Sequence, residues 1–255
     1  MILETILQFW YLILLFFIVA ILYSSVGFGG GSSYLAILAL TGIAFTQIRA
    51  TALLCNIVVV SGNVFLFYQQ KKLDWKKIIP LILFSIPFAF LGGKLKISQN
   101  FFFILLGFTL LFAAISMWIS KKISSSEEKN SKPKQLKNAS FGGIIGFVSG
   151  MVGIGGGIFL APLLHLTNWD ISKKIAATAS LFILVNSVAG LIGQTSNPYF
   201  QIDWNLTSIL LFTVFIGGQI GSRMSNKFLN SIQLKKATAI LIAFVSIKIL
   251  IKYLL

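Results

Sequence analysis

Two glycine runs stand inside apolar sequence, where the backbone rather than the side chains could do chemistry. Residues 27–31 read GFGGG, and residues 153–157 read GIGGG, 126 positions further along the chain. Glycine destabilises a helix interior, so each run predicts a break in an apolar helix. Where a helix restarts after such a break, its first N–H groups lack intrahelical partners and, together with the helix dipole, attract an anion. The sequence therefore predicts an anion site at each restart.

Residues beside the runs extend this prediction. Glycine keeps side chains away from an approaching anion. Ser32 and Ser33 can cap the first restart and add hydroxyl donors. The second restart has Ile158 and Phe159 at the equivalent positions. Close helix packing is the alternative use, which we expect for Gly142, Gly143, Gly146 and Gly150. The candidate substrate-binding residues are Gly27, Gly29, Gly30, Gly31, Ser32, Ser33, Arg49, Thr51, Asn56, Gly153, Gly155, Gly156, Gly157, Thr178 and Ser180.

The side chains in that set each have two interpretations. Arg49 offers a planar set of donors to an oxyanion, or it snorkels from an interfacial position to water. Thr51, Thr178 and Ser180 lie in the first turns of their expected spans, with Asn56 deeper. These polar residues either line a path between the two halves or form interhelical hydrogen bonds.

Composition places these residues in a membrane protein. The 255-residue chain is 56% hydrophobic with a mean hydropathy of +0.90, and runs such as 6–26 are nearly free of charge. The net charge of +15 comes from lysines between apolar stretches. This pattern is typical of cytoplasmic loops and not of a nucleic-acid partner. No carboxylate falls at an expected membrane centre, which disfavours a cation pump.

Further matches at similar spacing indicate an internal duplication. Ala50-Thr51-Ala52 recurs at 177–179, Asp74-Trp75 at 203–204 and Gly92-Gly93 at 217–218. We expect a first membrane repeat at 1–119, a cytoplasmic linker rich in lysine and serine at 120–138, and a second repeat at 139–255. After its glycine run each half has three expected spans, at about 46–69, 78–95 and 100–119, and at about 174–194, 205–223 and 235–254.

Each glycine segment either crosses the bilayer once as a broken helix or returns to its starting side as a re-entrant hairpin. Single crossings put 12 of the 21 basic residues on the side of the linker, whereas two hairpins put 16 there. The positive-inside rule favours the hairpins, although the 6–26 run is long enough to span by itself. The expected fold is all-α, with two inverted repeats, each a glycine-broken helix segment plus three transmembrane helices.

The glycine runs, the Ala-Thr-Ala segments, the Asp-Trp pairs and the GGQIGSR sequence at 217–223 resemble the TauE/SafE family of sulfite and organosulfur-anion exporters. The resemblance covers nearly the whole chain, but Lys96 and Ser98 stand where the second half has Gly221 and Arg223. It implies a transporter of sulfite, thiosulfate or an organosulfonate such as sulfoacetate in the cytoplasmic membrane of a bacterium or archaeon.

We therefore expect a secondary transporter that holds its anion near the membrane midplane and works by alternating access. An anion channel with the same site, or a transporter of another small ion, is the alternative. We expect no cofactor, since His165 and Cys55 alone cannot build a metal site. The sequence shows no nucleophile–base pair of the kind that would indicate an enzyme. The expected partners are the anion and the bilayer, with a homo-oligomer left open, but no nucleic acid.

Overall fold

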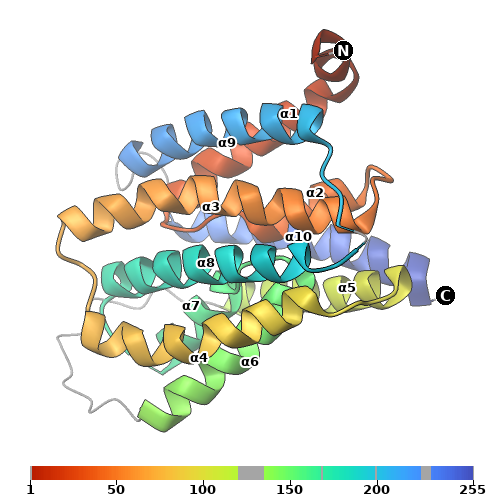
Figure 1. The fold of residues 1–255 in the computed structure, drawn as a ribbon. Helices are drawn as coiled ribbons and strands as arrows, with labels where there is room; N and C mark the ends of the chain where they lie inside the picture. The colour runs from red at the N-terminus through yellow and green to blue at the C-terminus, as the bar shows by residue number, and fades with distance from the viewer. Residues whose placement is uncertain (1, 120–134, 168, 199, 225–230, 255) are drawn as a thin grey trace.

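The computed structural model describes residues 2–119, 135–167, 169–198, 200–224 and 231–254, and all regular secondary structure within these residues is α-helical (Figure 1). Each half begins with a long helix and a short helix, followed by three long helices. The helices are α1 (Ile2–Ser25), α2 (Gly31–Ala39), α3 (Phe45–Gln69), α4 (Trp75–Lys94), α5 (Gln99–Ile119), α6 (Gln135–Val152), α7 (Gly157–Leu166), α8 (Ser172–Thr195), α9 (Trp204–Met224) and α10 (Ser231–Leu254).

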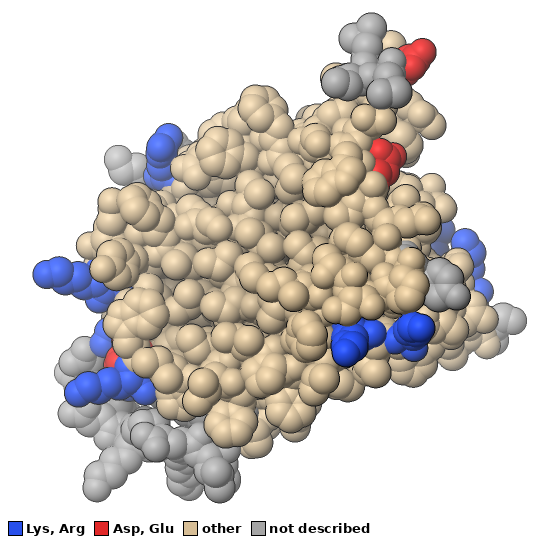
Figure 2. All heavy atoms as spheres, viewed as in Figure 1, with Lys and Arg blue, Asp and Glu red and all other residues tan. Residues whose placement is uncertain are grey.

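Six of the described helices are long and apolar enough to cross a bilayer: α1, α3, α4, α5, α8 and α9. Their outer surfaces are apolar as well. Leu7, Phe65, Leu83 and Phe212 are each more than 60% exposed. Figure 2 shows a face that is uncharged over its middle, with the lysines and arginines gathered toward two opposite ends of the molecule. This distribution suits a lipid environment around the middle of the bundle. The three spans expected in each half are confirmed as helices to within a few residues, and most of the expected linker lies outside the described residues.

Helices of one half pack on helices of the other half. α1 packs on α9 while α6 packs on α4, and α3 packs on α9 while α8 packs on α4. The equivalent helices α3 and α8 pack on each other, as do α5 and α10. Neither half is a separate bundle, because the first helix of each half lies against the other half.

α3 and α8 run antiparallel at the centre of the molecule. A Cβ on Gly27 would lie 3.1 Å from Phe67 near the end of α3 and 3.3 Å from Ala176 near the start of α8. Toward the other end, a Cβ on Gly190 would lie 3.6 Å from Leu53. The start of each helix therefore lies beside the end of the other, as Figure 1 also shows.

Each glycine segment returns to the end of the bundle where it began. α1 lies parallel to α9, with Phe17 beside Gly217 and Ile21 beside Gly221. α9 starts beside the start of α3, where Thr207 and Thr51 are bonded at 3.0 Å. Since α2 leads directly into α3, α1 starts and α2 ends at the same end.

The second glycine segment is arranged in the same way from the opposite end. α6 lies parallel to α4, and α7 leads into the start of α8, beside the start of α4. A Cβ on Gly142, Gly146 or Gly150 would meet α4 carbonyls. The packing role expected for these glycines is therefore confirmed.

Candidate functional site

Both glycine runs break their helices, as expected. Gly30 and Gly156 are the N-caps of α2 and α7, with φ of 88° and 83°, in the left-handed region that favours glycine. The expectation that Ser32 and Ser33 cap the first restart is wrong. Gly30 occupies the N-cap position and α2 has no side-chain cap, so both serines lie within its first turn.

The two breaks meet inside the molecule around Asn56 of α3. The Asn56 amide donates a hydrogen bond from Nδ2 to the Ile154 carbonyl at 2.8 Å, which ties the second break to α3. A Cβ on Gly31 would collide with this amide and would lie 2.8 Å from the Ile154 carbonyl oxygen. A Cβ on Gly29 would collide with the same side chain, and one on Gly155 would lie 3.0 Å from its nitrogen. Three glycines therefore allow the breaks to close around one asparagine.

A small cavity lies where the two short helices begin. Its volume is about 50 Å³, room for three to five waters at roughly 10–15 Å³ each. None of its described lining residues is Lys, Arg, Asp or Glu. The cavity is lined by Tyr23, Phe28, Gly29, Gly30, Gly31, Ser32, Asn56, Ile154, Gly157, Ile158, Ala161, Pro162, His165 and Ile183. We call it the central cavity.

Backbone N–H groups at the N-termini of α2 and α7 lie at the wall of this cavity. The first helical bond of α2 runs from the Tyr34 N–H to the Gly30 carbonyl, and that of α7 from the Phe159 N–H to the Gly156 carbonyl. The preceding N–H groups, including those of Gly31 and Gly157, have no intrahelical acceptor. Two positive helix ends therefore line a cavity in which the described lining residues carry no Lys, Arg, Asp or Glu side chain.

Hydroxyl groups add to the polar side of the cavity. Ser33 donates to the Tyr23 hydroxyl at 2.9 Å, and the Ser32 hydroxyl lies 3.5 Å from the same oxygen. Asn56 Oδ1 is buried without a hydrogen-bond partner among the described residues. Sequence reasoning missed Tyr23 because it lies before the first break, on α1, and only the turn brings it back beside α2. His165 also lines the cavity, from the far end of α7.

The structure brings six of the predicted residues to the central cavity and places the others around it. Ser180 donates to the Gly27 carbonyl, so this pair joins the first break to α8. Gly153 packs on the backbone of Arg49, and Gly156 packs on Phe182. The six lining residues are Gly29, Gly30, Gly31, Ser32, Asn56 and Gly157.

The two threonines and Arg49 do not line the central cavity. Thr51 bonds Thr207 of α9 at 3.0 Å, and Thr178 donates to the Lys174 carbonyl within its own helix at 2.9 Å. Arg49 is 2% exposed, so it does not snorkel to water. Its Nη2 instead points to the carbonyls of Gly93 and Gly150, at 3.5 and 3.4 Å.

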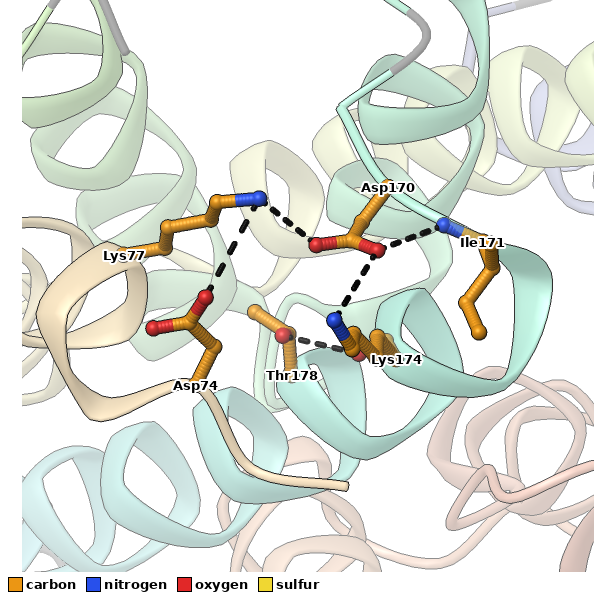
Figure 3. Close-up of polar contacts among 6 residues, drawn as sticks. All are labelled: Asp74, Lys77, Asp170, Ile171, Lys174 and Thr178. Carbon is orange, nitrogen blue, oxygen red and sulfur yellow. Dashed lines mark hydrogen bonds and ion pairs between the residues drawn. The ribbon is translucent and has the colours of Figure 1, made fainter. Parts of the chain in front are cut away.

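An ion cluster joins the turn after α7 to the start of α4 (Figure 3). Lys77 Nζ lies 2.7 Å from the Asp170 carboxylate and 3.9 Å from Asp74, and Lys174 lies 3.7 Å from Asp170. Burial raises the pKa of Asp170, but hydrogen bonds from Lys77 and the Ile171 N–H, with the charges of Lys77 and Lys174, outweigh burial and lower this pKa below its usual value.

Helices of membrane-spanning length around two interrupted helices that meet at an internal cavity define the architecture of a multi-pass membrane transporter. Residues 12–249 match the family described as sulfite exporter TauE/SafE, and the chain belongs to this family. The chain is thus a transporter and not an enzyme, and the resemblance seen in its glycine motifs is confirmed.

Relatives span nearly the whole chain. A probable membrane transporter protein of Sinorhizobium fredii is 32% identical over 241 residues, which cover 92% of this chain and 95% of that protein. Another, of Methanocaldococcus jannaschii, is 29% identical over 234 residues, covering 85% and 86%. A third, of Bacillus subtilis, is 25% identical over 232 residues, covering 85% and 90%. No solved structure matches the chain significantly.

Proposed function

We propose that this protein is a secondary transporter of a small sulfur oxyanion such as sulfite, held in the central cavity by the N-termini of α2 and α7. The observation that carries the proposal is the convergence of two helix N-termini on one cavity, whose described lining residues include no Lys, Arg, Asp or Glu. The family description supports the choice of a sulfite-type anion.

Backbone donors explain how an anion is held reversibly. The free N–H groups at Gly31, Ser32, Gly157 and Ile158 supply hydrogen bonds and the positive ends of two helix dipoles. The Tyr23 hydroxyl supplies a further polar contact. Because none of the described residues that line the cavity is lysine or arginine, they give the anion no fixed counter-ion that would hold it too tightly for release. The cavity volume favours an anion of a few heavy atoms over a bulky organosulfonate.

The arrangement of the hairpins supports alternating access by inverted repeats. The α1–α2 hairpin starts from one end of the bundle and the α6–α7 hairpin from the other, and each tip packs on the other half. Since the tips meet at the central cavity, movement of one hairpin tip against the helices around it opens the cavity toward one side at a time. We place the linker end in the cytoplasm of a cell-membrane protein, because 16 of the 21 basic residues belong to that end in this arrangement. The repeats then comprise 1–119 and 139–255.

Reconstitution tests this function. The purified chain in phosphatidylcholine liposomes should take up radiolabelled sulfite with saturable kinetics. Unlabelled sulfite on the far side should accelerate the exchange, which is the property of a carrier. Sulfate, taurine and chloride serve as competitors. Unitary currents with no exchange acceleration would indicate a channel, and flux that fails to saturate and ignores sulfite would refute the proposal.

A further inference from the structure

A second and larger cavity lies at the end of the bundle where α3 and α5 begin. Its volume is about 590 Å³, against about 50 Å³ for the central cavity. We call it the vestibule, because Lys96, Ser98 and Gln99 on its wall are exposed. It is lined by Phe45, Thr46, Arg49, Lys96, Ile97, Ser98, Gln99, Asn197, Pro198 and Gln201.

The charge of the vestibule has one sign. Arg49 and Lys96 line it, and none of its described lining residues is Asp or Glu. The Arg49 guanidinium is buried, its Nε has no hydrogen-bond partner, and no ion pair joins it to a carboxylate among the described residues. A buried charge without a counter-ion is costly, so the site is incomplete without an anion.

Backbone dipoles reinforce the positive potential. α3 begins at Phe45 and α5 at Gln99, and both residues line the vestibule. The N-termini of two helices thus face the same space as Arg49 and Lys96. Thr46, Gln99 and Gln201 add neutral side chains that can donate hydrogen bonds.

The vestibule and the central cavity share a wall at the second glycine break. A Cβ on Gly153 would lie 3.2 Å from the Cα and the carbonyl oxygen of Arg49, and the next residue, Ile154, lines the central cavity. Arg49 also points to the carbonyls of Gly93 and Gly150 over long distances of 3.5 and 3.4 Å. These weak contacts leave the guanidinium able to exchange carbonyl partners for a better acceptor.

We propose that the vestibule is a second anion site, in which Arg49 and Lys96 bind one oxyanion on its way to or from the central cavity. Guanidinium presents paired donors that match two oxygens of a sulfite, sulfonate or phosphate group. The inference rests on the proposed anion transport for its substrate. The competing explanation is that Arg49 only neutralises the C-terminal ends of α4 and α6.

Lys96→Met tests the proposal with Lys94→Met as its matched control. Lys94, the last residue of α4, is exposed two residues away and is not among the described residues that line the vestibule, so the two variants remove the same charge from neighbouring positions. In phosphatidylcholine liposomes at low ionic strength, Lys96→Met should raise the half-saturating sulfite concentration about fivefold, with an unchanged maximal rate. Lys94→Met should leave both values at those of the wild type. Arg49→Lys should also raise the half-saturating concentration, because it keeps the charge and loses the paired donors.

If the wild type transports sulfite and Lys96→Met does not change the half-saturating concentration, the vestibule is not an anion site. The proposed function would remain intact. An effect that appears only when 30% phosphatidylglycerol is added would overturn the vestibule proposal too, since the site would then hold a lipid phosphate. If the wild type transports no sulfite, the proposed function fails. Thermal stabilisation by sulfite then decides whether the vestibule binds an anion. Stabilisation that Lys96→Met weakens supports the vestibule site, and a wild type that sulfite does not stabilise contradicts it.

Discussion

The close contact between the two glycine breaks makes Gly31→Ala a sharp test of the central packing. Gly31 is the first residue of α2 and its φ is not positive, so alanine meets no backbone strain there. The new methyl would nevertheless collide with the Asn56 amide and lie 2.8 Å from the Ile154 carbonyl oxygen. Relief requires the amide to move and the two breaks to separate.

The expected cost follows from these contacts. Loss of the buried hydrogen bond from Asn56 to Ile154 costs about 1–3 kcal/mol, and overpacking costs about 1–3 kcal/mol. Alanine at a helical position offsets up to about 1 kcal/mol. These contributions sum to a destabilisation of about 1–6 kcal/mol, with a central value of about 3 kcal/mol. At roughly 2–4 °C per kcal/mol for a chain of this size, the apparent melting temperature in detergent should fall by about 6–12 °C. Sulfite transport should fall with it, because the donors of α2 and α7 no longer converge.

Gly218→Ala is the matched control on α9. A Cβ there would lie 3.5 Å from Val59, an ordinary contact, so this variant should be neutral or slightly stabilising. Combining Gly31→Ala with Asn56→Ala removes the colliding amide, and the two changes should be coupled by about 1 kcal/mol or more. Wild-type stability and transport in Gly31→Ala would refute the reasoning, since the breaks would not be in close contact.

Three further experiments test other parts of the structure. Asp170→Asn should destabilise the protein by about 1–2 kcal/mol at pH 7, because Lys77 and Lys174 lose their shared carboxylate. Since the folded state lowers the pKa of Asp170, its stabilisation is present above the unfolded value of about 4 and is lost as the pH falls through the folded value. Melting temperatures should therefore differ at pH 7 and converge below about pH 4, and a gap that persists in acid would contradict this role. Gly153→Ala should destabilise more than Gly42→Ala in the same melting assay: both have positive φ, but Gly42 has open space where Gly153 meets the Arg49 backbone. The third experiment introduces single cysteines at the exposed positions Gln8 and Thr167 in a Cys55→Ser background. Impermeant maleimide should label the cysteine at position 8 from outside and the one at position 167 from the cytoplasm. Labelling of both from one side would contradict inverted hairpins.

Local sequence signals predicted most of the fold. Apolar length and glycine breaks are properties of short segments, so the six later spans and both helix restarts could be placed to within a few residues. The charge count favoured hairpins over single crossings, and the structure returns each glycine segment to its starting end. The one local error was the cap of α2. Ser32 follows the break like an N-cap, but the left-handed Gly30 already ends the turn.

Long-range register explains what the sequence did not provide. Arg49 precedes Asn56 by about two turns on α3 and Thr51 by about one and a half, and of these three residues only Asn56 reaches the central cavity. Which turn of α3 faces the breaks depends on how α3 packs against α8 and on how deep each hairpin tip inserts. Close backbone contacts at glycines hold each hairpin against a distant helix, such as Gly221 of α9 against the Ile21 carbonyl of α1. No short segment encodes such a pairing.

The central claim is that an oxyanion sits between the N-termini of α2 and α7, and selenite tests it most directly as a heavier analogue of sulfite. Crystals soaked in selenite and measured at the selenium edge should give an anomalous peak in the central cavity, beside the N–H groups of Gly31 and Gly157. A weaker peak beside Arg49 is expected as well. A central cavity without selenium at concentrations that saturate transport would contradict the account.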